Sequence, residues 1–252
     1  KGIPIINLLG IDSSEKIQAI IAVTGQAEEG HYLFFTTRQG TVKRTTVTAF
    51  ANIRSNGLIA IGLKEDDELV NVLLTDGRSN IIIGTHNGYS VTFSEEAVRD
   101  MGRTASGVRG IRLREEDYVV GAALMNEDQE VLIITEKGYG KRTKVSEYPV
   151  KGRGGKGIKT ANITEKNGPL AGLATVVGDE DIMLITDKGV IIRFNVATVS
   201  QTGRATLGVR LIKMEADTKV VTMATVEPES PEEPTSEEVD ASTETTDDQS
   251  EE

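Results

Sequence analysis

Two series of glycines run through the chain in step, and they constrain its fold more than any other feature. The first series consists of Gly40, Gly88, Gly138 and Gly189. The second consists of Gly57, Gly107, Gly157 and Gly208. Neighbouring members lie 48, 50 and 51 residues apart in the first series and 50, 50 and 51 apart in the second. A repeat of this length is typical of propeller-like β-proteins.

Each first-series glycine separates two extended runs. In HYLFFTTRQGTVKR, which begins at His31, β-branched and aromatic residues suit strands and the glycine suits a tight turn. A third extended run follows each second-series glycine, and a polar turn and a last strand complete the unit. We therefore predict an all-β, propeller-like fold of four-stranded blades of about 50 residues. Residues 94–100 and 195–200 are expected to form short helical turns. A β-sandwich with coincidental spacing is the alternative, and two series in step argue against it.

Charge divides the chain into two parts. The net charge is −11, but Glu227–Glu252 holds twelve acidic residues and no basic one. The preceding 226 residues hold 28 basic residues and 39 − 12 = 27 acidic ones, a net charge of +1. We predict a folded domain over 1–226, which starts in mid-repeat at Gly2, and a disordered acidic tail over 227–252. The tail is interpreted either as a solubilising segment or as a polyanion that competes with a nucleic acid for the basic surface.

Basic residues recur at fixed positions of the repeat. Four residues after the first-series glycine stand Arg44, Arg142 and Arg193. Around the second-series glycines stand Arg103, Arg153 and Arg204, four residues before, and Arg109, Lys159 and Arg210, two residues after. The first copy has Arg54 one place later and Ile59 in place of a cation. Residues at one position of a blade share one latitude of the disc, so an arc of positive charge is expected.

The densest basic stretch lies between residues 137 and 159. It contains Lys137, Lys141, Arg142, Lys144, Lys151, Arg153, Lys156 and Lys159, with Glu147 as its single acid. Gly154, Gly155 and Gly157 would let backbone N–H groups approach a phosphate. A flexible surface loop with solvated charges is the alternative interpretation.

A curved array of cations suits the bending of double-stranded DNA through phosphate contacts, without sequence readout. We predict DNA binding by a set of basic and glycine residues. This set is Lys43, Arg44, Arg54, Arg103, Arg109, Lys137, Lys141, Arg142, Lys144, Lys151, Arg153, Gly154, Gly155, Lys156, Gly157, Lys159, Arg193, Arg204 and Arg210. Aromatic residues make up only 4% of the chain, so base stacking on single strands is a weaker hypothesis.

The sequence offers little for catalysis or metal binding. It has no cysteine, and its two histidines, His31 and His86, are far apart. The spacing of a P-loop, a calcium loop and a G-x-S-x-G motif is absent. The acidic groups at 65–67 and 115–117 share one position of the repeat and are interpreted as turns. No apolar run reaches the ~20 residues of a membrane span. We predict no catalytic residue and no metal site.

Three stretches resemble the C-terminal DNA-wrapping domain found in the A chain of bacterial DNA gyrase. They are GRTASGVRGIRL from Gly102, GYGKRTKVSEYPVKGRGGKGIKT from Gly138 and GVIIRFNVATVSQTGRATLGVRLI from Gly189. The resemblance covers residues 1 to about 226. It implies a β-pinwheel of six blades that exchange outer strands, with about four and a half blades in this chain. Residues 153–157 match the last five positions of the family's Gln-Arg-Arg-Gly-Gly-Lys-Gly box, whereas Lys151 and Gly152 depart from it. The intact box is expected upstream of Lys1.

The same resemblance implies partners and a role. The family's domain wraps double-stranded DNA and provides the chiral wrap for ATP-dependent negative supercoiling by a type II topoisomerase. The gyrase B protein and a second gyrase A protein complete an A2B2 heterotetramer, and ATP and Mg²⁺ are expected in the partner protein, with no cofactor here. The DNA-cleaving tyrosine lies upstream in the family, so this segment is expected to be non-catalytic. The implied location is the bacterial cytoplasm, at the nucleoid and not at a membrane. The equivalent domain of topoisomerase IV and a protein-binding propeller remain alternatives.

Overall fold

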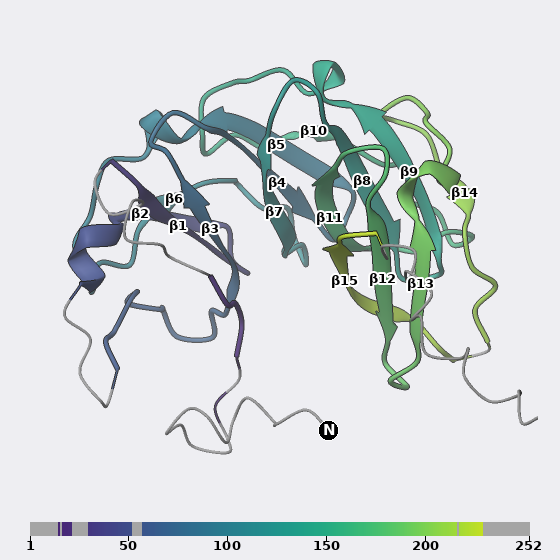
Figure 1. The fold of residues 1–252 in the computed structure, drawn as a ribbon, viewed down its shortest axis with the longest axis horizontal. Coiled ribbons are helices and arrows are strands. Elements are labelled where there is room, and N and C mark those ends of the chain that lie inside the picture. Colours follow the sequence, from purple (N-terminus) through teal and green to yellow (C-terminus); the bar gives the residue numbers. More distant parts are fainter. Residues whose placement is uncertain (1–14, 16, 22–29, 52–56, 216, 229–252) are drawn as a thin grey trace, which may run out of the picture.

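The computed structural model describes residues 15, 17–21, 30–51, 57–215 and 217–228. These residues form four antiparallel sheets that follow one another along an arc (Figure 1). The sheets correspond to the four repeats, so the prediction of an all-β, propeller-like fold is confirmed. We refer to the sheets as blades 1 to 4 in chain order.

Each blade is built on a hairpin. The hairpin strands are β1 (Tyr32–Thr37) and β2 (Thr41–Thr46), β4 (Asn80–Thr85) and β5 (Tyr89–Ser94), β8 (Glu130–Thr135) and β9 (Tyr139–Lys144), and β12 (Asp181–Thr186) and β13 (Ile191–Asn195). The inner strands are β3 (Leu69–Thr75), β7 (Val119–Met125), β11 (Leu170–Val176) and β15 (Val220–Val226). The outer strands are β6 (Val108–Arg109), β10 (Ile158–Lys159) and β14 (Val209–Arg210). Short 3₁₀ turns follow the hairpins at Val47–Phe50, Glu95–Ala97, Val145–Glu147 and Val196–Thr198, and two of these confirm the expected helical turns.

The outermost strand of a blade comes from the next repeat. Strand order is β3-β1-β2-β6 in blade 1, β7-β4-β5-β10 in blade 2 and β11-β8-β9-β14 in blade 3. In blade 1, Arg109 pairs with Thr41 and Val108 with Val42. Repeats 2 to 4 therefore contain their four predicted strands, and the third strand of each belongs to the sheet of the preceding blade, which confirms strand exchange. In the first repeat, the predicted third strand after Gly57 is wrong, because residues 57–63 form no strand. Blade 4 has the order β13-β12-β15 and no outer strand among the described residues.

The two glycine series have the same spacing because both line the contact where an outer strand is exchanged between repeats. Gly88 has φ of +82°, and a Cβ there would lie 2.7 Å from Ile163 Cγ1 and 3.1 Å from Ala161 O. Gly157 has φ of +72°, and a Cβ there would lie 2.5 Å from Ser90 O. The segment that follows a second-series glycine thus packs against the turn glycine of the preceding repeat. Neither position has room for a side chain.

The recurring carboxylates hold the hairpin turns. Asp117 Oδ2 accepts a hydrogen bond from Thr85 Oγ1 at 2.8 Å, and its Oδ1 accepts from the Asn87 N–H at 2.9 Å. Asp67 binds Thr37 Oγ1 and the Gln39 N–H in the same way, at 2.7 and 2.9 Å. Both aspartates are buried. The interpretation of these acidic groups as turns is confirmed.

Consecutive blades are joined by main-chain bonds and by apolar packing. The residue two places before each turn glycine accepts a hydrogen bond from the next inner strand at 2.9 Å. These bonds run from Val119 N to Arg38 O, from Leu170 N to His86 O and from Val220 N to Glu136 O. Buried side chains such as Phe34, Ile83 and Phe93 pack into one cluster between blades 1 and 2. The blades therefore form one continuous body rather than separate sheets.

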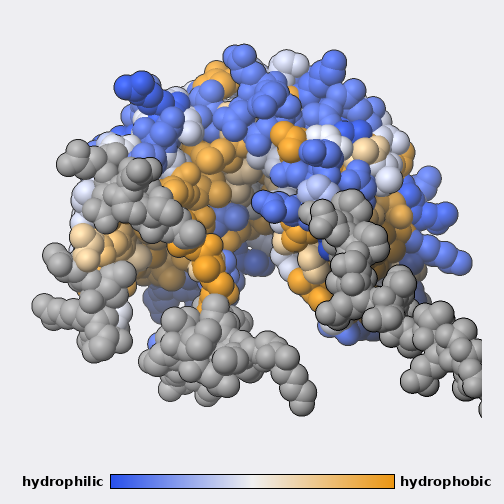
Figure 2. Space-filling model, viewed as in Figure 1, coloured by the Kyte–Doolittle hydropathy of each residue, from blue (hydrophilic) through white to orange (hydrophobic). Residues whose placement is uncertain are grey.

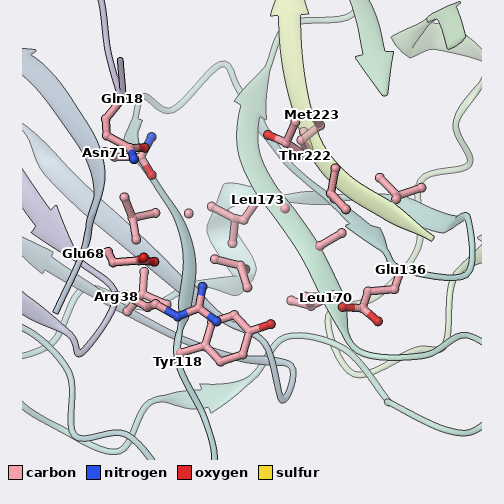
Figure 3. Close-up of a pocket in the computed structure, with 18 of the residues that line it drawn as sticks. Gln18, Arg38, Glu68, Asn71, Tyr118, Glu136, Leu170, Leu173, Thr222 and Met223 are labelled. Atoms are coloured by element: carbon pink, nitrogen blue, oxygen red, sulfur yellow. The ribbon is translucent and has the colours of Figure 1, made fainter. Parts of the chain in front are cut away.

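A polar cavity of about 390 Å³ lies among the inner strands (Figure 3). The Arg38 guanidinium lies 3.6 Å from the centroid of the Tyr118 ring, and that ring stacks on His86 at 4.4 Å. Glu136 Oε1 lies 3.5 Å from His86 Nε2 and 3.6 Å from Lys219 Nζ. These contacts cross all three blade interfaces and give the cavity a structural role.

The turn carboxylates can be tested by substitution. Asp117→Ala leaves the Thr85 hydroxyl and two main-chain N–H groups without their acceptor, so we expect the free energy of unfolding to fall by about 1–3 kcal/mol. Urea denaturation of the domain would measure this change. Glu115→Ala in the same exposed turn is the matched control and should be nearly neutral. Equal losses in the two variants would contradict the capping role.

Candidate nucleic-acid interface

The segments that supply the outer strands carry only positive charge. We call residues 101–113, 149–163 and 200–213 the rim segments. Together they contain ten lysines and arginines and no aspartate or glutamate. Because each segment gives the outermost strand to a successive blade, their charges follow the outer edge of the arc. Figure 2 shows hydrophilic residues along this convex edge and apolar residues toward the concave side.

Most predicted rim cations are accessible. Arg103 and Arg204 are half-buried, and the exposed ones are Arg109, Lys151, Arg153, Lys156, Lys159 and Arg210. Arg112 and Lys213 are also exposed on the rim, although the sequence analysis did not select them. Both lie five residues after a second-series glycine, where the other repeats have Gly62 and Asn162. Because this position is basic in only two of the four repeats, the repeat pattern does not identify it as a cation site.

Main-chain hydrogen bonds hold the glycine-rich loop 151–157 against β5 and the preceding rim segment. Its main-chain bonds join Lys151 N to Thr92 O at 2.8 Å, Gly154 N to Gly110 O at 2.6 Å and Gly155 O to Arg112 N at 2.8 Å. Arg114 Nη1 also donates to Lys156 O at 2.7 Å. The alternative of a flexible loop does not fit this geometry. The loop instead presents Lys151 and Lys156 from a fixed backbone.

Lys43 and Lys141 are interior residues, so the expectation that they lie on a DNA-binding surface is wrong. Both side chains are fully buried. Lys43 Nζ donates to the carbonyls of Ala60 and Arg103. Lys141 Nζ donates to the Gly203 carbonyl at 2.7 Å, to the Arg204 carbonyl and to Thr206 Oγ1 at 3.2 Å.

The sequence contained a sign of this burial. The equivalent residues in the other repeats are Val91 and Ile192, as expected of a position that faces the interior. Strand alternation places residues three after the turn glycine on the inner face of the sheet. The charge of the two lysines obscured this inward-facing position in the sequence. Burial lowers the pKa of both Lys43 and Lys141 from 10.5 to about 8.

The sequence analysis expects an arc of positive charge four residues after the turn glycine, but the arginines at this position form ion pairs within their blades. Arg44 Nη2 lies 2.6 Å from Asp100 Oδ1, and its side chain is only 11% exposed. Arg142 Nη1 lies 2.8 Å from Glu130 Oε2, and Arg193 Nε lies 2.8 Å from Asp181 Oδ2. For Arg142 and Arg193 the acid lies twelve residues earlier, on the neighbouring hairpin strand. We assign these three arginines to blade structure.

Two other predicted residues, Lys137 and Lys144, lie away from the rim. Lys137 is exposed in the β8–β9 turn, where its Nζ donates to Glu165 O, and Lys144 is exposed at the end of β9. Arg54 and the tail beyond residue 228 lie outside the described residues. In the described ranges, no cluster of three or more His, Cys, Asp or Glu side chains could hold a metal ion. No helix in that part of the chain is long and apolar enough to cross a membrane.

Comparison with known proteins identifies one family. A sequence profile described as "DNA gyrase C-terminal domain, beta-propeller" matches residues 31–76, 79–124, 129–176 and 180–227, the four repeats in turn. The DNA gyrase A protein of Streptococcus pyogenes is 65% identical over 229 residues, which are 91% of this chain and 28% of that protein. The gyrase A protein of Staphylococcus aureus is 47% identical over 245 residues, again 28% of its length. The chain thus spans just over a quarter of the curated relatives it matches.

Solved structures share the architecture. The C-terminal domain of DNA topoisomerase IV superposes with a TM-score of 0.83 at 31% identity, covering 90% of this chain and 71% of that one. A DNA gyrase A C-terminal domain gives a TM-score of 0.79 at 25% identity, covering 89% and 75%.

The buried ammonium of Lys141 provides a test of the interior assignment. Between about pH 8 and 10.5 the folded chain has released this proton while the unfolded chain still binds it, so this group makes stability rise with pH over that window. We expect the Cε resonance of Lys141 to titrate in NMR with a midpoint near 8. A midpoint for Lys141 at the ordinary lysine value of 10.5 would contradict burial.

Proposed function

Because the chain belongs to the DNA gyrase C-terminal β-propeller family, we propose that its rim segments bind double-stranded DNA and bend it around the convex edge of the arc. In the whole protein this wrap would supply the crossover for ATP-dependent negative supercoiling by a type II topoisomerase. A second gyrase A protein and the gyrase B protein would complete the assembly. ATP and Mg²⁺ would bind in the partner protein and no cofactor in this segment. The cytoplasm, at the nucleoid, is the proposed location.

One observation carries the proposal: ten cations and no acid lie on the three segments that form the outer edge. Smooth bending of a 20–30 bp duplex costs roughly 1–6 kcal/mol. Phosphate contacts that release counterions can offset this energy, provided that several cations meet the backbone together. Acidic residues occur instead in the turns, such as Glu65, Glu115 and Glu165. The charge distribution therefore favours the edge over either face of the disc.

Gyrase is favoured over topoisomerase IV as the parent. The sequence relatives with 63% and 65% identity are gyrase A proteins. The topoisomerase IV domain shares the fold at lower identity. Because both domains are propellers, the rim charges by themselves do not distinguish the two enzymes.

Charge reversal on the rim tests the proposal. In the full-length protein, the double variant Lys151→Glu/Lys156→Glu should weaken binding to a linear duplex more than tenfold, because it replaces two cations on the fixed loop. The matched control is Lys64→Glu/Lys166→Glu, which changes the net charge equally in the exposed turns. Filter binding should place the control within about twofold of the wild type. An unaffected rim variant would favour a protein-binding propeller.

Salt dependence gives a second test. With ~6–10 phosphate contacts, affinity for duplex DNA should fall ~10³–10⁵-fold between 50 and 200 mM salt. The slope of log affinity against log salt should be about two units smaller in the double rim variant, because two phosphate contacts are lost. Binding that does not change with salt would contradict DNA wrapping by the rim.

A further inference from the structure

Two rim arginines hold the protein's own main chain. We infer that Arg153 and Arg204 are positioning residues: each fixes the outer strand of the neighbouring blade so that the cation on that strand, Arg109 or Lys159, faces the DNA. The inference rests on the proposed function, since it assigns roles within the same rim. It departs from the simple interpretation that every rim cation binds a phosphate.

The geometry is the same in two successive repeats. Arg153 Nη1 donates to Arg109 O at 3.1 Å, and Arg204 Nη1 donates to Lys159 O. The two acceptors occupy the same position of the repeat, on β6 and β10. Each of these two rim segments therefore holds the outer strand supplied by the segment before it.

Both guanidinium groups donate hydrogen bonds to main-chain carbonyls within the protein. Arg153 Nε also donates to Ala97 O at 2.8 Å, so one planar group joins β6 to the 3₁₀ turn after β5. Arg204 is half-buried, and its Nε is buried without a hydrogen-bond partner among the described residues. A lysine ammonium has the same charge but cannot reproduce this planar set of donors.

The outer strands need this additional arginine hydrogen bond because they are short. β6, β10 and β14 contain only two residues each. So few ladder bonds at the edge of a sheet leave the direction of the strand weakly determined. A charge-assisted bond to the carbonyl of the exposed basic residue fixes the peptide next to that side chain.

The remaining repeat supports the assignment by contrast. In the segment 57–63 the corresponding residue is Ile59, which has no charge to direct and is 67% exposed. Arg103, the arginine of the next segment, forms no side-chain hydrogen bond with the described residues. Its carbonyl is instead an acceptor for Lys43 Nζ. This arginine bond is thus present at Arg109 and Lys159, the two cations at this position that are followed by another rim segment among the described residues.

Hydrogen bonds to two other side chains fix the loop that carries Arg204. The main-chain N–H of Arg204 donates to Glu147 Oε2 at 2.8 Å. The buried Lys141 ammonium donates to the carbonyls of Gly203 and Arg204. This arrangement gives a role to the only acid of the densest basic stretch: Glu147 anchors the loop rather than opposing DNA.

A double-mutant cycle in the full-length protein tests whether Arg204 acts through Lys159. We expect Arg204→Lys, which keeps the charge, to weaken binding to a linear duplex about tenfold. Lys159→Gln should also weaken binding, and adding Arg204→Lys to it should cause no further loss, because the residue that Arg204 directs is already gone. Arg78→Lys is the matched control, since Arg78 is an exposed arginine in the turn before β4, outside the rim segments. It should stay within about twofold of the wild type and add its small effect to that of Lys159→Gln.

The outcomes separate the inference from the proposed function. If Arg204→Lys binds like the wild type and only Arg204→Gln loses affinity, Arg204 is a direct phosphate contact and the inference is overturned. If Lys159→Gln and Lys151→Glu/Lys156→Glu both bind like the wild type, the proposed function itself fails. Thermal unfolding shows whether each variant is folded. Should Arg204→Lys unfold, the equivalent cycle of Arg153→Lys with Arg109→Gln decides between the same outcomes.

Discussion

The exchange of the outer strand is the constraint on which the other features depend. Each blade is closed by a segment of the following repeat, and this segment packs where a turn glycine leaves space for it, as Ile163 and Ala161 do at Gly88. A repeat can therefore complete its sheet only with the next repeat in place. Blade 4 shows the converse: among the described residues β13 has no outer neighbour, and Ile191 is 57% exposed. Stability in such an array resides largely in the interfaces between neighbours.

Strand exchange also separates the charges. Acidic residues such as Asp67 and Asp117 are occupied in capping the hairpin turns at the end of the blade. Other acids neutralise the arginines that follow the turn glycine, as Glu130 does for Arg142. The exchanged segments contain no acid that could pair with their own cations. Positive charge is consequently concentrated along the outer edge, although residues 1–226 together have a net charge of only +1.

The geometry of the exchanged strands also explains which features the sequence predicted and which it did not. Spacing located the turns and most of the strands, since a turn glycine and the extended runs beside it act locally. It also located the rim position of Arg109, Lys159 and Arg210 correctly. It did not reveal that Lys141 lies inside, because the charge of the lysine outweighed the apolar residues at the same position of other repeats. It did not reveal that Arg142 is paired, because its contact with Glu130 depends on the register of the hairpin. A recurring charge thus indicates a shared position in the blade, but not whether that position faces solvent.

Rigidity of the rim matters as much as its charge. A stiff duplex gains nothing by bending toward cations on mobile loops, because such loops can reach a straight duplex instead. Bending is favoured only when the cations are held on a curve before DNA arrives, so that the binding energy is available only to bent DNA. The main-chain bonds between successive rim segments meet this requirement: Gly155 O accepts from Arg112 N at 2.8 Å, and Thr206 O accepts from Asn162 N at 3.0 Å. Under the proposed function, these main-chain bonds and the side-chain bonds of Arg153 and Arg204 would together fix the curve on which the other cations bind DNA.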